Sequence, residues 1–203
     1  YMLTNYRFQI LPPVVKNLLI INVLLWLATL VLKGSPFSID LTQTLGLHYW
    51  KSELFKPWQI VTYMFMHDTQ GFTHILFNMF AVWMFGTHLE NRWGSKKFLN
   101  YYLLTGFGAA FLHYLIVHFQ VINIEANMNY EQIMTIVNEG KGPAGISWSN
   151  ARKLFFLYNT PVVGASGSLF GILLAFGVLF PNTLLYLYFA IPIKAKYFVI
   201  GYG

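Results

Sequence analysis

The chain is dominated by apolar runs that are long enough, or nearly long enough, to cross a lipid bilayer. Four such runs cover residues 14–32, 73–88, 98–118 and 162–180. A fifth begins after Lys194 and Lys196 and continues to Gly203. A helix needs about 20 mostly apolar residues to cross the hydrocarbon core, where backbone polar groups must be satisfied internally. The pattern therefore predicts an all-α fold, a polytopic bundle of transmembrane helices.

The composition supports a membrane protein rather than a soluble one. Hydrophobic residues make up 56% of the chain and charged residues 10%, whereas about a quarter of the residues in soluble domains are charged. Aromatic residues reach 19%, which suits the Trp and Tyr belts of membrane interfaces. The run at residues 14–32 follows Arg7 and Lys16 like a signal sequence, but no small-x-small cleavage site follows it, so we interpret it as a retained span.

The charge and the cysteine content exclude several functional classes. The net charge is +6, yet Lys and Arg form no cluster of the kind that binds nucleic acid, so the partner expected for these cations is the lipid bilayer. The chain has no cysteine, which excludes disulfides, thiolate catalysis and cysteine-ligated metals.

Two long connections separate the predicted spans. Residues 33–72 are too interrupted to cross a bilayer, but Trp50 and Trp58 make them too aromatic for a free loop, so we expect an interfacial, partly embedded segment. Residues 121–157 form a second, more polar connection. Since the sequence shows no internal repeat, residues 1–203 are expected to form a single membrane domain.

Basic residues indicate the orientation. Threading the spans alternately puts seven cations on one side: Arg7, Lys16, Arg92, Lys96, Lys97, Lys194 and Lys196. Six lie on the other side: Lys33, Lys51, Lys56, Lys141, Arg152 and Lys153. The first group lies close to the span ends with only Glu90 against it, whereas the second shares long loops with six acids. Because short cytoplasmic loops carry the excess of cations, we predict a cytoplasmic N-terminus and a multi-pass protein of the plasma or inner membrane.

Three polar residues inside spans require an explanation, because such groups are costly in a bilayer and are usually functional. His74 and Asn78 are four residues apart and so lie on one face of their helix. Ser166 lies within Gly164-Ala165-Ser166-Gly167, at the start of another span. Both spans enter from the non-cytoplasmic side, so we predict that the three side chains converge.

Such a cluster suits acyl transfer. Ser166 would lie in the first turn of its helix, where free backbone N–H groups and the positive end of the dipole favour an oxyanion. His74 and Asn78 would add donors, each worth about 10²–10³ in turnover in a known case. Gly164 and Gly167 would leave the serine uncrowded.

Structural roles compete with this interpretation. Gly167 and Gly171 form a GxxxG pattern, which packing between helices explains without catalysis. His74 and Asn78 could serve interhelical hydrogen bonds. The other span-end histidines are expected at the interface: His88, His113 and His118.

Taken in order, these residues resemble the rhomboid family of intramembrane serine proteases. Residues 57–67 (PWQIVTYMFMH) resemble the end of the family's first loop, and His74 with Asn78 resembles its HxxxN oxyanion helix. Gly164–Gly167 resembles the nucleophile motif. The charged turn and a following aromatic also match: Glu90, Arg92, Gly94 and Phe170.

The resemblance implies a six-span protease that uses a serine–histidine dyad, without metal or cofactor, to cleave membrane-spanning proteins. Ser166 would be the nucleophile, and His74, Asn78 and the Ser166 backbone N–H would hold the oxyanion. Gly164, Gly167 and Phe170 would support the site. The sequence does not indicate an oligomeric state.

The sequence also departs from the family pattern. Rhomboids take their general base from a sixth span, and no histidine follows His118. We therefore expect that about four and a half spans are present, that the C-terminal part is missing, and that the 203-residue piece alone is inactive. Gln59 stands where many members have Arg. Two alternatives remain: an inactive rhomboid-like protein that binds clients, and a transporter or channel subunit, which the absence of acids inside the predicted spans disfavours.

Overall fold

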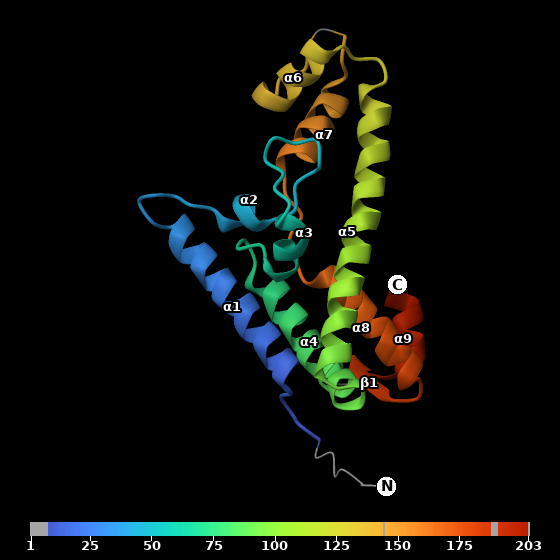
Figure 1. Cartoon of the computed structure of the whole chain (residues 1–203). Coiled ribbons are helices and arrows are strands. Elements are labelled where there is room, and N and C mark those ends of the chain that lie inside the picture. Colours follow the sequence, from blue (N-terminus) through green and yellow to red (C-terminus); the bar gives the residue numbers. More distant parts are fainter. Residues whose placement is uncertain (1–7, 144, 188–190, 203) are drawn as a thin grey trace.

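The bundle is built from four helices that match the four predicted spans (Figure 1). The structure is a computed structural model that describes residues 8–143, 145–187 and 191–202. The four helices are α1 (Pro13–Lys33), α4 (Phe72–Trp93), α5 (Ser95–Glu125) and α8 (Ser166–Leu179). The fifth apolar stretch contributes α9 (Ala195–Tyr202). The helical membrane bundle predicted from the sequence is therefore confirmed.

The helices differ in how well they suit a bilayer. Within the described residues, α1 and α5 are long and apolar enough to cross a membrane by length and composition alone. α8 is apolar but has only 14 residues. α4 has 22 residues, but it carries His74, Asn78 and the charged turn. α4, the least apolar of the four helices, thus holds two of the three polar residues of the predicted site, His74 and Asn78.

Three helix boundaries differ from the prediction by four residues or more, and the first is the end of α4, which lies at Trp93 and not at His88. α5 continues past His118 to Glu125, because Val117 and Val121 are buried in a second apolar cluster. α8 begins at Ser166 and not at residue 162, because residues before it are held in an extended conformation.

The connection at residues 121–157 is not the plain polar segment that we predicted. It contains α6 (Tyr130–Glu139) and α7 (Trp148–Asn159), which pack together beside the far end of α5 (Figure 1). Asn129 and Gln132 form a capping box at the start of α6, and Gly140 ends it with a positive φ of 69°. Apolar side chains of α5, α6 and α7 form the second cluster.

The first connection is ordered and contains α2 (Leu41–Leu45), α3 (Gln59–Thr62) and a 3₁₀ turn, η1 (Tyr63–Phe65). Gln59 is fully buried, and its amide donates to the carbonyls of Thr44 and Leu54 at 3.2 and 3.0 Å. Its oxygen accepts the backbone N–H of Lys56 at 3.1 Å. Gln59 therefore stabilises the conformation of this loop. The interfacial depth of the loop stays a prediction.

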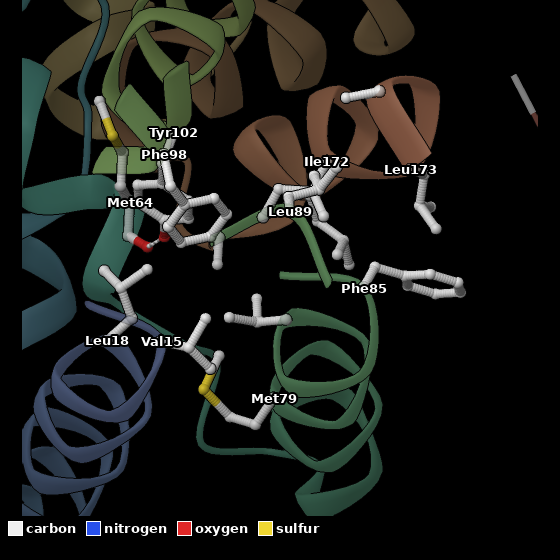
Figure 2. Packing of buried hydrophobic residues seen from close by; sticks show 14 of the residues in the cluster. Val15, Leu18, Met64, Met79, Phe85, Leu89, Phe98, Tyr102, Ile172 and Leu173 are labelled. Atoms are coloured by element: carbon white, nitrogen blue, oxygen red, sulfur yellow. Dashed lines mark hydrogen bonds between the residues drawn. The ribbon is translucent and has the colours of Figure 1, made fainter. Parts of the chain in front are cut away.

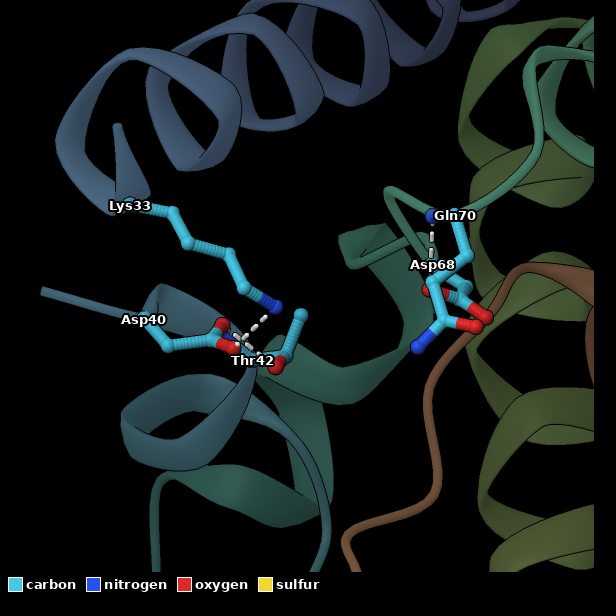
Figure 3. Close-up of polar contacts among 5 residues, drawn as sticks. All are labelled: Lys33, Asp40, Thr42, Asp68 and Gln70. Atoms are coloured by element: carbon cyan, nitrogen blue, oxygen red, sulfur yellow. Dashed lines mark hydrogen bonds and ion pairs between the residues drawn. The ribbon is translucent and has the colours of Figure 1, made fainter. Parts of the chain in front are cut away.

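An ion pair joins the first connection to the end of α1 (Figure 3). Lys33 Nζ lies 2.8 Å from Asp40 Oδ2, and Asp40 caps α2 by accepting the backbone N–H of Thr42 at 2.9 Å. Partial burial raises the pKa of Asp40, but the hydrogen bonds from Lys33 and Thr42 outweigh it and lower the pKa overall. Nearby, Asp68 accepts the backbone N–H of Gln70 at 2.9 Å.

The main core lies where α1, α4, α5 and α8 meet (Figure 2). Phe85 of α4 packs edge-on against Phe176 of α8, with ring centroids 4.9 Å apart. The other large members come from all four helices and η1: Leu18, Met64, Leu89, Phe98, Tyr102 and Ile172. This shared core fixes the helices relative to one another.

A short hairpin that we did not predict follows α8. Strands β1 (Leu184–Leu187) and β2 (Ile191–Lys194) are antiparallel, with Leu184 opposite Lys194. The hairpin leads into α9 and lies near the α4–α5 turn (Figure 1). We call this end of the bundle, with the start of α1, the basic face. The end that carries residues 33–71, 125–143 and 145–165 is the loop face.

Candidate active site

Ser166 begins α8 at the loop face, directly after a sharply bent segment. Val162 forms an antiparallel bridge with Leu47, and the Gly164 N–H donates to the Tyr63 carbonyl at 3.0 Å. Gly164 has a φ of +127°, a conformation that side chains rarely adopt. The bend therefore requires glycine, and it places the side chain of Ser166 at the very start of the helix.

His74 and Asn78 lie near the start of α4, which also begins at the loop face. A methyl group added to Gly164 would lie 3.5 Å from Ser166 Oγ and 3.9 Å from His74 Cε1. The two side chains therefore border the same small space beside Gly164. The structure thus brings Ser166 and His74 together from two helices, while Asn78 lies one turn deeper on the His74 side of α4.

Asn78 is buried, and its side-chain nitrogen Nδ2 has no hydrogen-bond partner within the described residues. Buried polar groups in proteins are almost always paired, so an unpaired donor requires an explanation. One explanation is that Nδ2 donates a hydrogen bond to a negatively charged oxygen that forms only during the reaction.

His67 also lies beside the site. The sequence pattern assigned it no role beyond being the last residue of the segment 57–67 that resembles the rhomboid first loop. Its ring is fully buried and packs edge-on against His74, with centroids 5.6 Å apart. Burial, with a smaller contribution from His74, lowers the pKa of His67 to about 4. The Phe65 backbone opposes this slightly, although neither ring nitrogen meets the geometry of a hydrogen bond. His67 is therefore neutral near pH 7 and supports the His74 ring without adding charge.

The glycines of α8 serve close packing against α5. A methyl group on Gly167 would lie 2.6 Å from Cβ of Ala109, and one on Gly171 would overlap Thr105. Tyr101 also donates its hydroxyl to the Gly171 carbonyl at 2.9 Å. The packing interpretation of the GxxxG pattern therefore agrees with the structure, and this packing also holds the first turn of α8 in place.

Phe170 lies one turn after Ser166 and is about half exposed. It lines an apolar groove of about 810 Å³ between α5, α8 and α9, together with Gly108 and Leu112. The structure therefore puts Phe170 on the side of α8 that faces this groove.

The three histidines that we expected at the interface have other neighbours. His118 hydrogen-bonds with the Tyr49 hydroxyl at 2.9 Å, and His113 lines a cavity of about 240 Å³ beside Lys153. His88 lies toward the basic face, next to Phe180. In the part of the chain that the structure describes, Ser166 Oγ forms no hydrogen bond with a histidine, and no group of three potential metal ligands occurs.

The comparison with protein families decides the relationship. A family model, the rhomboid domain, matches residues 54–202, which is well over half of the chain and includes Ser166, His74 and Asn78. The chain belongs to the rhomboid family. Rhomboids are membrane proteins, as the apolar helices of this chain indicate.

One curated relative supports this assignment. The RHOMBOID-like protein 6, mitochondrial, of Arabidopsis thaliana is 34% identical over 86 residues, which cover 40% of this chain. The match covers 27% of that relative, so this rhomboid chain aligns with about a quarter of its length. No solved structure matches the chain.

Proposed function

We propose that this rhomboid protein is an intramembrane serine endopeptidase that cleaves membrane-spanning proteins. The observation that carries the proposal is the placement of Ser166 at the start of α8, beside His74, with the unpaired amide of Asn78 in the same helix as His74. A serine, a nearby imidazole and free donors are what acyl transfer requires.

In the proposed mechanism, Ser166 Oγ attacks the scissile carbonyl carbon of the substrate. The carbonyl oxygen becomes negative as the tetrahedral intermediate forms. The backbone N–H of Ser166, in the first turn of α8, has no partner within its own helix and donates to that oxygen. His74 and the Nδ2 group of Asn78 add side-chain donors. When the C–N bond breaks, the amine leaves with the proton that the general base received from Ser166, and the acyl group stays on Ser166 until water hydrolyses the ester.

A general base must take the proton of Ser166. Family resemblance assigns this role to a histidine in a sixth span, which would follow residue 203. His67 does not serve as this base in our proposal, since it is fully buried behind His74 and has a pKa of about 4. A serine without a base keeps its proton, and turnover falls accordingly.

The test is cleavage of a model single-span substrate by the full-length protein in vesicles. Ser166→Ala should abolish cleavage, with a loss on the order of 10⁶ in turnover as in a well-studied serine protease. Ser168→Ala is the matched control, because Ser168 is a buried neighbour whose Oγ lies 3.9 Å from Met64 Sδ. If the full-length protein binds the substrate but does not cleave it, the result contradicts the protease proposal and favours an inactive rhomboid that binds client proteins.

We also propose that the basic face, and with it the N-terminus, lies in the cytoplasm of a cell whose plasma or inner membrane holds the protein. The excess of cations at the short turns supports this orientation. Because the chain has no natural cysteine, Lys96→Cys and Ser52→Cys can be labelled separately with an impermeant thiol reagent in intact cells. Only Ser52→Cys should react, and labelling of Lys96→Cys alone would reverse the orientation.

A further inference from the structure

The two ends of the bundle carry very different charge. Six described cations lie at the basic face, all of them exposed or half-exposed: Lys16, Arg92, Lys96, Lys97, Lys194 and Lys196. Figure 1 shows that the start of α1, the α4–α5 turn and the hairpin lie at the same end of the bundle.

In the described part of the chain, Glu90 is the only acid at this end, and it is not available to these cations. Glu90 is 2% exposed. Its carboxylate accepts the backbone N–H groups of Val14 and Val15 at 2.9 and 2.8 Å and the Ser95 hydroxyl at 2.6 Å. Glu90 therefore caps the start of α1 and leaves the exposed cations without a carboxylate partner.

The loop face balances its own charge. Its six cations share that face with six acids, and every ion pair within the described residues lies there. These pairs join Lys33 to Asp40, Lys51 to Glu125 and Lys141 to Glu139. The excess positive charge of the chain consequently belongs to the basic face.

The α4–α5 turn offers a recess for an anion at the expected depth of a lipid headgroup. The recess has a volume of about 440 Å³ and is lined by polar and aromatic groups: Trp93, Gly94, Ser95, Lys96, Lys97 and Asn100. Lys97 Nζ lies 5.4 Å from the centre of the Trp93 ring, and Arg92 lies over Phe180. Indole rings favour the membrane interface, and lysine stems extend toward the headgroups there.

We propose that the basic face binds the phosphodiester headgroups of acidic glycerophospholipids, with the recess at the α4–α5 turn as the principal contact. Charge complementarity selects this occupant, since the cations lie at the ends of membrane helices where lipid phosphates lie. The proposal goes beyond the proposed function, because it concerns the end of the bundle opposite Ser166 and does not depend on catalysis.

The experiment measures which lipids remain bound to the full-length protein purified in detergent from vesicles of equal phosphatidylglycerol and phosphatidylcholine. We expect bound phosphatidylglycerol to be enriched about fivefold or more over phosphatidylcholine, since each cation near an anionic surface contributes a factor of about five. The combined variant Arg92→Gln, Lys96→Gln, Lys97→Gln should lower the ratio severalfold, while Lys16, Lys194 and Lys196 keep part of the enrichment.

The matched control neutralises three loop-face cations that form no ion pair among the described residues: Lys56→Gln, Arg152→Gln and Lys153→Gln. It should keep the enrichment. Equal loss in both variants, or no loss in the first, would overturn the proposal. If the first variant does not fold, salt provides the second measurement: about 0.5 M salt should weaken the enrichment in the unchanged protein, because it screens such contacts. An enrichment that is absent, or that ignores salt, contradicts the proposal.

Discussion

Helix α4 carries a buried polar side chain near each end, and the two have opposite surroundings. Asn78, toward the loop face, has an amide nitrogen without a partner among the described residues. Glu90, toward the basic face, accepts three hydrogen bonds within 2.9 Å. Both cost free energy to bury, but only Glu90 recovers it within the described fold. The paired carboxylate of Glu90 indicates a structural role, whereas the unpaired amide of Asn78, on the His74 side of α4, is available to a ligand.

The largest effect that separates the two residues is expected for Asn78→Ala. Cleavage by the full-length protein should fall by about 10²–10³, since one oxyanion donor among several is removed. The melting temperature should stay nearly unchanged, because Nδ2 makes no hydrogen bond with any described residue. Both are measured on the same preparation, by substrate cleavage and thermal unfolding.

Asn22→Ala is the control for this prediction. Asn22 is also a buried asparagine with one unpaired side-chain atom, Oδ1, but it lies in α1, away from Ser166, and its Nδ2 group donates to the Leu18 carbonyl at 2.7 Å. It should leave the cleavage rate unchanged. A normal cleavage rate together with a lowered melting temperature in the Asn78→Ala variant would contradict the functional role of Asn78.

Glu90→Gln should have the opposite profile. Losing the charge weakens the hydrogen bonds to the start of α1, so stability should fall by about 1.5–3 kcal/mol, as for hydrogen bonds to charged groups. Cleavage at a temperature where the variant is folded should be normal. The measurement is chemical unfolding, with Glu139→Gln as control.

Glu139 lies on the surface and, among the residues that the structure describes, pairs with Lys141 alone, 3.1 Å away. Such pairs contribute about 0–1 kcal/mol. Equal destabilisation by the two Glu→Gln changes would show that the Glu90 contacts do not stabilise the bundle.

A smaller effect concerns pH and the loop face. The pKa of His67 is about 4 in the fold, below the ordinary value of 6.5. Below about pH 6.5 the unfolded chain therefore binds a proton that the folded chain does not, so stability falls as the pH drops toward about 4. When the pH falls from about 7 to about 5, the melting temperature of the His67→Phe variant should decrease less than that of the unchanged protein. If the pH dependence of the melting temperature is the same in the His67→Phe variant, another titratable group causes it. The His88→Gln variant serves as the control.

Local sequence patterns predicted the spans and the pairing of α4 with α8, because apolar runs and a polar i, i+4 pair depend only on nearby residues. α6 was missed although its signals were local: Asn129 with Gln132 at the start and Gly140 at the end. Attention to capping residues would have found this helix.

Long-range contacts explain the other misses. The start of α8 depends on the bridge between Leu47 and Val162, and the role of Glu90 depends on α1, which is distant in sequence. Gln59 departs from the family pattern that the sequence resembles, yet it satisfies several backbone groups of the first loop. No local pattern contains these partners, so the sequence alone does not predict them.

The most direct test of the account is covalent labelling of the full-length protein with a fluorophosphonate probe, followed by mass spectrometry of its peptides. The probe reacts with an activated serine, so we predict one adduct, on Ser166, that survives Ser168→Ala and disappears in Ser166→Ala. An adduct on Ser168 instead, or a protein that cleaves its substrate while Ser166 stays unlabelled, would contradict the assignment of Ser166 as the nucleophile.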